Sequence, residues 1–237
     1  MNMRVLNIFV AGLAALAFSL SALAQDCCCS ADSKSKYVAL SFDDGPSLKF
    51  TPMMLDVLEK NGVKASFFLI GQNINEETAP IIRRMVRMGC DVENHTYSHP
   101  NLTQIPDAQI LEEVAKTDSL IALYAGAKPE YLRPPFTAHN AHIADLIDGK
   151  IFIAGLSCRD WRADMPVEDR VTMTLDRVED GRILLFHDTN ERTVEAMKTI
   201  IPQLKARGYE FVTIPELFRL SGHTPACHSP KMYGRAY

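Results

Sequence analysis

The stretch Ser41-Phe42-Asp43-Asp44-Gly45-Pro46-Ser47 places two adjacent carboxylates between an apolar run and a Gly-Pro turn. The residues that lead into it, 37–42, have the length and composition of a buried β-strand. A strand that ends on acidic residues at a sharp turn presents them at the rim of a sheet, where ligands usually bind. Because two neighbouring carboxylates repel each other, they need a metal ion, another cation or a shared proton between them.

Apolar runs of strand length recur along the chain and alternate with helical patterns. Strands are predicted at 37–42, 65–70, 91–94, 131–133, 151–156, 182–186 and 210–213. Helices are predicted at 51–61, with Thr51 as N-cap, and at 79–88, 106–124, 140–147, 167–178 and 193–206. This alternation predicts an α/β fold, a closed or nearly closed (β/α) barrel with about seven parallel strands. A doubly wound open sheet is the alternative.

The N-terminus has the pattern of a secretory signal peptide, residues 1–24. Arg4 is followed by an apolar run to Leu20 and by Ser21-Ala22-Leu23-Ala24, which predicts cleavage after Ala24. A retained membrane anchor is the alternative reading, but the apolar run is near the short limit for a spanning helix. We expect a secreted or periplasmic protein with no stable membrane insertion after cleavage. The remainder divides into a polar arm (25–36), one domain (37–222) and a tail (223–237).

Charge and cysteine usage restrict the partners. The formal net charge is −4 and no basic stripe is visible, which argues against a nucleic-acid partner. Six cysteines fit an exported protein, and a disulfide from Cys27, Cys28 or Cys29 to Cys227 would join the two ends of the domain. A lipidated Cys27 is disfavoured because Gln25 and Asp26, and not small residues, precede it. A metal site built on the three cysteines is possible, but no second group of ligands lies at a recognisable spacing.

Polar residues follow most of the predicted strands at their C-terminal ends, the face on which barrel active sites are built. In chain order they are Asp43 and Asp44, His95 to His99, Arg133-Pro134-Pro135-Phe136, Asp160-Trp161, and His187-Asp188.

His95 and His99 are four residues apart, so one helical turn would put both imidazoles on the same side. Two neutral imidazoles and the carboxylate of Asp44 suit Zn²⁺ or a similar divalent ion. The alternative is a pair of helix-capping or surface histidines. With a metal on Asp44, Asp43 can take a proton from water, because a bound metal lowers the pKa of water to about 7.

The other polar positions have both a functional and an ordinary structural interpretation. His187 could protonate a leaving group with Asp160 as its orienting partner, although a histidine after a strand is often a packing or capping residue. Arg133 could pair with Asp43, or form an ordinary surface ion pair. Trp161 and Leu185 could wall a small apolar pocket or belong to the core.

Five motifs in this order resemble the NodB-homology polysaccharide deacetylases, carbohydrate esterase family 4. They are Ser-Phe-Asp43-Asp44-Gly-Pro, His95-Thr-x-x-His99, Arg133-Pro-Pro-Phe136, Asp160-Trp161 and Leu185-x-His187. The resemblance extends from Tyr37 to about Leu220. It implies a distorted (β/α) barrel in which 37–222 is the catalytic domain, and metal-dependent removal of acetyl groups from sugars.

The resemblance also implies roles for the acids and for the metal ligands. Asp44, His95 and His99 would bind one divalent metal ion, with zinc expected and cobalt or nickel as alternatives. Asp43 would be the general base, and Arg133 would steady it.

For the rest of the site, the resemblance implies that His187 is the general acid and that Asp160 tunes it. The backbone N–H of Phe136 would join the metal in stabilising the oxyanion. Trp161 and Leu185 would line the pocket for the acetyl methyl group.

The chain departs from the family pattern at three places. Ser41 replaces the usual threonine, Phe136 stands where tyrosine is common, and Ser157 occupies a position that is often aspartate. The change at Phe136 keeps a backbone donor but loses any phenol contact with substrate.

We therefore expect hydrolysis of acetyl groups from N-acetylglucosamine units of peptidoglycan or chitin-type oligomers outside the cytoplasm. The expected partner is an acetylated polysaccharide. An O-acetyl esterase acting on xylan would use the same residues and is the alternative. A non-catalytic sugar-binding protein is a rival of another class, but it predicts loss of a base, an acid or a metal ligand.

Overall fold

The computed structural model describes residues 35–237 except residue 228. The predicted signal peptide, nearly all of the polar arm, and Cys27, Cys28 and Cys29 lie outside the described residues. Residues 35–237 form one compact unit. The disulfide to Cys227 and the division into arm, domain and tail stay predictions.

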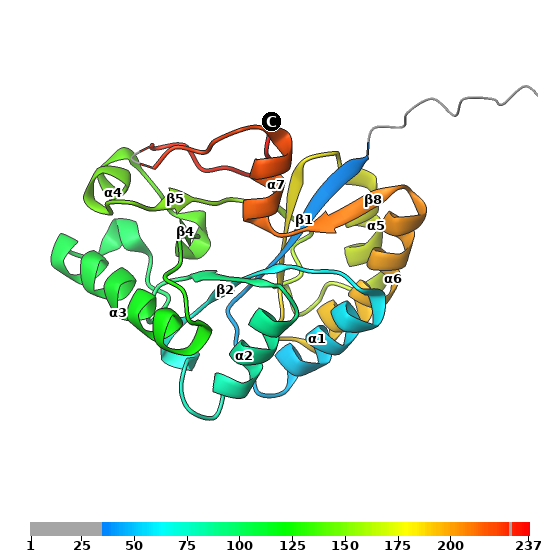
Figure 1. Cartoon of the computed structure of the whole chain (residues 1–237), viewed down its shortest axis with the longest axis horizontal. Helices are drawn as coiled ribbons and strands as arrows, with labels where there is room; N and C mark the ends of the chain where they lie inside the picture. The colour runs from blue at the N-terminus through cyan, green and yellow to red at the C-terminus, as the bar shows by residue number, and fades with distance from the viewer. Residues whose placement is uncertain (1–34, 228) are drawn as a thin grey trace, which may run out of the picture. The chain divides into compact units, whose positions relative to one another are not determined.

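Strands and helices alternate along the described chain (Figure 1). The strands are β1 (Lys36–Asp43), β2 (Ser66–Leu69), β3 (Asp91–Asn94), β4 (Tyr131–Leu132), β5 (Ile151–Phe152), β6 (Leu156–Ser157), β7 (Arg182–His187) and β8 (Tyr209–Val212). The helices are α1 (Phe50–Asn61), α2 (Ala79–Arg87), α3 (Asp107–Ala125), α4 (Ala141–Leu146), α5 (Val167–Arg177), α6 (Glu191–Ala206) and α7 (Ile214–Ser221). Short 3₁₀ turns are η1 (Gly71–Asn73), η2 (Leu102–Gln104) and η3 (Pro135–Thr137).

The strands form one parallel sheet in the order β5-β4-β3-β2-β1-β7-β6, and β8 also pairs with β1. Helices α5, α6, α1, α2 and α3 follow one another along the outside of this sheet (Figure 1). In the register of β1, Asp43 lies opposite Phe68 of β2 and opposite His187 of β7. This pairing brings the first acid and the last histidine of the predicted site to the same end of the sheet.

The sheet curls into the distorted barrel that the sequence predicts. Strands β5 and β6 belong to one segment, 151–157, and β5 pairs with β4 while β6 pairs with β7. The C-terminal residues pair with this part of the sheet. Tyr233 bridges Ile153, between β5 and β6, and Arg235 bridges Arg182, at the start of β7. The single strand predicted at 151–156 is therefore divided in two, because its middle residues pair with the C-terminal segment.

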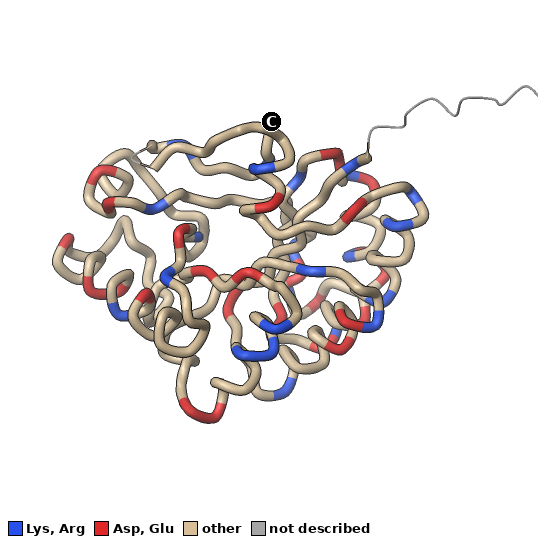
Figure 2. Tube along the Cα trace, viewed as in Figure 1, with Lys and Arg blue, Asp and Glu red and all other residues tan. Residues whose placement is uncertain are grey.

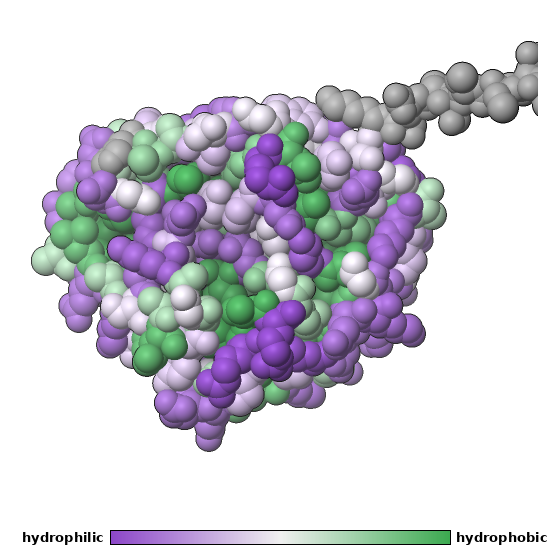
Figure 3. Space-filling model, in the orientation of Figure 1, coloured by the Kyte–Doolittle hydropathy of each residue, from purple (hydrophilic) through white to green (hydrophobic). Residues whose placement is uncertain are grey.

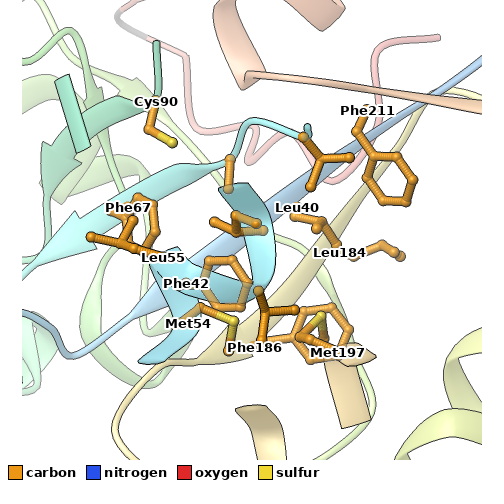
Figure 4. Packing of buried hydrophobic residues seen from close by; sticks show 14 of the residues in the cluster. Leu40, Phe42, Met54, Leu55, Phe67, Cys90, Leu184, Phe186, Met197 and Phe211 are labelled. Carbon is orange, nitrogen blue, oxygen red and sulfur yellow. The ribbon is translucent and has the colours of Figure 1, made fainter. Parts of the chain in front are cut away.

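Aromatic and aliphatic side chains on the outer face of the central strands pack against the helices (Figure 4). The ring of Phe42 lies 5.3 Å from that of Phe67 and 6.1 Å from that of Phe186, centroid to centroid. Met54 of α1 and Met197 of α6 are fully buried in the same cluster. Burial of each such side chain stabilises the fold by about 1.5–3 kcal/mol. The packing fixes the end of β1 from which Asp43 and Asp44 project.

One helix prediction needs correction, and one helix was not predicted. The first helix begins at Phe50, and Thr51 is not its N-cap. The Thr51 hydroxyl instead accepts a hydrogen bond from the Ser47 N–H (2.7 Å) and donates one to Asp188 (2.5 Å), because the buried Asp188 carboxylate needs a donor. Helix α7 was not predicted, although Thr213 and Glu216 form a capping box at its start, which is a recognisable sequence signal.

Lys and Arg are interspersed with Asp and Glu over the described elements (Figure 2). The face shown in Figure 3 is hydrophilic over most of its area, with hydrophobic residues between the polar ones. Within residues 35–237, none of the helices has the length and apolar character needed to cross a membrane.

Candidate active site

Asp43 is buried at the end of β1, and Arg133 holds one of its oxygens. Arg133 Nη1 donates to Asp43 Oδ1 (2.5 Å), while Nη2 donates to Ser41 Oγ (2.9 Å) and to the Ala154 carbonyl (3.1 Å). The guanidinium also lies 4.1 Å from the centroid of the Phe68 ring. Complete burial lowers the pKa of Arg133, and the charge of Asp43 opposes that shift. The second oxygen of Asp43, Oδ2, lies 3.9 Å from His95 Nε2.

Asp44 lies in the left-handed backbone region, with φ 72°, unlike Asp43 in the strand before it. Its Oδ1 lies 3.3 Å from His95 Nε2 and 3.5 Å from His99 Nε2. This oxygen is buried and accepts no hydrogen bond from the described residues. Burial raises the pKa of Asp44, but contact with His95 and the charges of the neighbouring histidines outweigh it and bring the pKa below its usual value.

Asp44, His95 and His99 each offer one ligand atom, and the three atoms lie within 4.8 Å of one another. One carboxylate and two imidazoles are a suitable donor set for a divalent transition metal, and three protein ligands leave room for water and substrate. The unsatisfied Asp44 Oδ1 fits the same assignment, since a metal ion would satisfy it. The three residues therefore form a metal-binding triad.

The segment from His95 to His99 is a loop and not the helical turn that the spacing suggested. Thr96 (φ 66°) and His99 (φ 62°) are both left-handed. The imidazoles still converge, with ring centroids 4.9 Å apart. The helical interpretation was wrong because backbone groups of this loop bond to other segments and to side chains, which a residue spacing cannot reveal.

The tautomer of His95 is set by its neighbour. His95 Nδ1 lies 2.6 Å from the Arg133 carbonyl oxygen, which can only accept a hydrogen bond. Nδ1 therefore carries a proton, and Nε2 faces Asp44, where it is the ring nitrogen available to a metal ion. A histidine held this way is oriented for metal binding, and Arg133 thus acts on both Asp43 and His95.

His187 ends β7 and is held by the buried Asp160. Asp160 Oδ1 lies 2.9 Å from His187 Nδ1, and Oδ2 accepts hydrogen bonds from the His187 backbone N–H (2.7 Å) and the Thr193 hydroxyl (2.9 Å). Burial lowers the pKa of His187, but the hydrogen bond and charge of Asp160 outweigh it and raise that pKa to about 9. His187 Nε2 lies 4.0 Å from Asp44 Oδ2, so it faces the triad.

A cavity of about 490 Å³ joins these groups. Its lining includes nine of the ten residues predicted for the site: Asp43, Asp44, His95, His99, Arg133, Phe136, Trp161, Leu185 and His187. The tenth, Asp160, is buried and reaches the cavity through His187. Phe136 and Trp161 are 67% and 64% exposed, so two large apolar side chains stand at the mouth.

The cavity continues past Trp161. An adjoining space of about 410 Å³ shares Asp44, Trp161 and His187 with this cavity, is also lined by Asp160, and reaches Thr189–Arg192 at the start of α6.

Two buried acids near the site were not assigned a role from the sequence: Glu113 was not singled out, and Asp188 was named only as a polar residue after its strand. Glu113 of α3 accepts hydrogen bonds from the loop between His95 and His99. Asp188 is fully buried beside His187, and its Oδ1 has no hydrogen-bond partner among the described residues. The position of Asp188 directly after His187 was a usable signal, whereas Glu113 is one of several acids on a long helix.

The chain matches known proteins over most of its length. The family described as polysaccharide deacetylase matches residues 30–148. The chain is 43% identical to the bifunctional xylanase/deacetylase of Pseudobutyrivibrio xylanivorans, over 80% of this chain and 32% of that protein. It is 36% identical to the peptidoglycan-N-acetylglucosamine deacetylase of Bacillus cereus, over 78% of this chain and 69% of that protein. It thus spans about a third of the first relative's length.

Solved structures agree. A family 4 acetyl xylan esterase from Clostridium thermocellum, in complex with a cobalt ion, superposes with a TM-score of 0.82 at 40% identity and covers 84% of this chain and 98% of its own. The Xyl-CE4 domain of a multidomain xylanase from the hindgut metagenome of Trinervitermes trinervoides superposes with a TM-score of 0.82 at 41% identity. The match covers 85% of this chain and 98% of that domain's chain. The five motifs, the barrel and the triad lead to one conclusion: the chain belongs to the polysaccharide deacetylase family, carbohydrate esterase family 4.

Proposed function

We propose that this protein hydrolyses acetyl esters on xylan. The relatives described above that are 40–43% identical have xylan or xylanase in their names, whereas the relative named for peptidoglycan is 36% identical. This ordering favours the O-acetyl esterase over the N-acetylglucosamine deacetylase that the sequence motifs first suggested. Both reactions remove an acetyl group, and the same residues serve both.

One observation carries the hydrolytic function. At one cavity, the metal-binding triad lies between the Asp43–Arg133 pair and the Asp160–His187 pair. Asp44, His95 and His99 would hold a metal ion, which would act as a Lewis acid that polarises the acetyl carbonyl and makes water more acidic. Asp43 accepts the proton of the attacking water at Oδ2, because its Oδ1 is engaged by Arg133.

His187 donates a proton from Nε2 to the departing sugar oxygen. With its pKa near 9, the imidazole is protonated at neutral pH, and Asp160 keeps Nδ1 engaged so that Nε2 faces the cavity. The Phe136 N–H is the proposed donor to the oxyanion. Trp161 and Leu185 provide an apolar wall for the acetyl methyl group. General acid–base steps of this kind contribute about 10²–10⁴-fold each.

The test compares acetate release from acetylated xylan, chitooligosaccharides and peptidoglycan. Each substrate is assayed with protein loaded with Zn²⁺ or Co²⁺ and again after chelation. We expect the highest kcat/KM on acetylated xylan and loss of activity on chelation. Faster release from either N-acetylated polymer would establish N-deacetylation, the second candidate. Metal binding without turnover on any of them would support a sugar-binding protein.

We also propose that the mature protein acts outside the cytoplasm, on the pattern of residues 1–24. Expression of the full chain followed by N-terminal sequencing of the exported fraction tests this. A mature terminus at Gln25 is expected, and an uncleaved chain confined to the cytoplasm contradicts it.

A further inference from the structure

The loop between His95 and His99 must satisfy its backbone polar groups without a helix. Asn94 Oδ1 accepts the Thr96 N–H at 2.7 Å. On the other side, the η1 turn supplies donors, since Gly71 N–H bonds to the Thr96 carbonyl and Gln72 N–H to the Tyr97 carbonyl, both at 2.9 Å. These contacts do not involve the amides of Tyr97 and Ser98.

Glu113 satisfies both amides. Its Oε2 accepts the Tyr97 N–H at 2.8 Å and the Ser98 N–H at 2.7 Å, and its Oε1 accepts the Ser98 hydroxyl at 2.6 Å. Glu113 is 7% exposed on α3, and these three hydrogen bonds are partly buried. A carboxylate accepts such hydrogen bonds more strongly than a neutral carbonyl does.

Other residues of α3 confine the same loop. Lys116 Nζ lies 3.5 Å from the centroid of the Tyr97 ring. An added Cβ at Gly71 would lie 2.5 Å from Thr117 Oγ1 and 2.8 Å from the Tyr97 ring, so the η1 turn, the loop and α3 are in close contact. Among these neighbours, Glu113 is the one that binds the loop amides.

The loop needs such a partner because its conformation is strained. Thr96 and His99 are non-glycine residues at positive φ, a backbone region that L side chains rarely adopt. These two residues set the direction of both imidazoles. Without the carboxylate, the loop amides would have to find other partners, and the imidazoles would separate unless a metal held them.

We propose that Glu113 is a positioning residue that holds His95 and His99 in the metal-binding arrangement before the metal arrives. The proposal rests on the proposed function in that the triad binds a metal ion. Residues behind the ligands of a metal site typically change its affinity 10- to 100-fold. Glu113 contacts neither the side chains of the metal ligands nor the active-site cavity. Its effect on the affinity of the triad for metal is therefore exerted through the loop backbone.

The test measures Zn²⁺ affinity by competition with a chromophoric chelator, together with the melting temperature of the metal-free protein. Glu113→Ala should bind Zn²⁺ roughly 10- to 100-fold more weakly than wild type. Glu113→Gln should lie much closer to wild type, since its carbonyl can still accept both amides. Glu112→Ala is the matched control, because Glu112 is exposed on the same helix one residue away, and its affinity should be unchanged.

A folded Glu113→Ala variant with wild-type affinity overturns the proposal, even if its melting temperature falls, since a purely structural role predicts that result. If Glu113→Ala does not fold, Glu113→Asp decides, because it keeps the charge but withdraws the carboxylate by one methylene. Weaker Zn²⁺ binding by that variant supports the proposal, and equal binding refutes it. Failure of the wild-type chain to bind Zn²⁺ or Co²⁺ contradicts the proposed function itself.

Discussion

Arg133 donates a hydrogen bond to Asp43 at 2.5 Å inside the barrel, while its own carbonyl oxygen lies 2.6 Å from His95 Nδ1. One residue therefore engages the acid proposed as the base through its side chain and a proposed metal ligand through its backbone. The side chains of Arg133 and Asp43 are 1% and 4% exposed. The pair is thus almost entirely buried at the wall of the cavity.

Replacing Arg133 by Met should be strongly destabilising. It leaves the Asp43 charge buried without a partner, which typically costs about 3–5 kcal/mol. Urea unfolding in the presence of a chelator measures the difference. Lys198→Met is the control, because Lys198 pairs with Glu195 at the surface, and such pairs contribute about 0–1 kcal/mol. Equal effects of the two variants would contradict a buried, coupled pair.

Removing the carboxylate of Asp160 should shift the pH dependence of activity. His187 works as an acid only while protonated, so wild-type kcat/KM should decline as the pH rises through about 9. In Asp160→Asn the interactions that raise this pKa are weakened, and the decline should begin at lower pH. Profiles of kcat/KM between pH 6 and 10 test this. Superimposable alkaline limbs would rule out Asp160 as the residue that tunes His187.

His95→Ala should abolish metal binding at concentrations that saturate wild type, because it removes one of three ligands. Equilibrium dialysis against Co²⁺ measures the bound metal. His142→Ala provides the control, since His142 is exposed and pairs with Asp107. Stoichiometric Co²⁺ in the His95 variant would show that the metal lies elsewhere.

Asp188 should make stability depend on pH. Burial raises its pKa to about 7, against 3.8 for the ordinary carboxyl, although the Thr51 hydroxyl opposes this shift. The folded state then binds a proton more tightly than the unfolded state, so the contribution of this group to stability falls as the pH rises from about 4 to 7. Asp188→Asn stays neutral and should gain melting temperature relative to wild type as the pH rises through that range. A constant difference from pH 4 to 8 would contradict the shift.

Much of the fold was predictable because its signals are local. Apolar runs bounded by Gly and Pro locate the strands, and acids and histidines at the ends of these runs locate the site, since parallel strands bring those ends together. Asp43 and His187, which are both proposed for proton transfer, also lie opposite each other in the register of β1 and β7. The closure of the sheet by Tyr233 and Arg235 was not predictable, because such bridges depend on tertiary contacts.

The support of the metal ligands was not predictable for the same reason. The spacing of His95 and His99 is compatible with a helical turn, and only the contacts with Asn94, Gly71 and Glu113 show that the segment is a loop. Glu113 is fifteen residues from Ser98 and belongs to another element. By contrast, the Thr213–Glu216 capping box before α7 was present in the sequence, so that helix could have been predicted.

The most direct measurement is the rate of acetate release from acetylated xylan by wild type and Asp43→Asn, with bound metal quantified in the same samples. Asparagine keeps the size of the side chain but cannot take a proton from water. The variant should therefore retain one metal ion per chain and lose about 10²–10⁴-fold in kcat. Full activity in metal-loaded Asp43→Asn would contradict the division of the two adjacent acids into a base and a metal ligand.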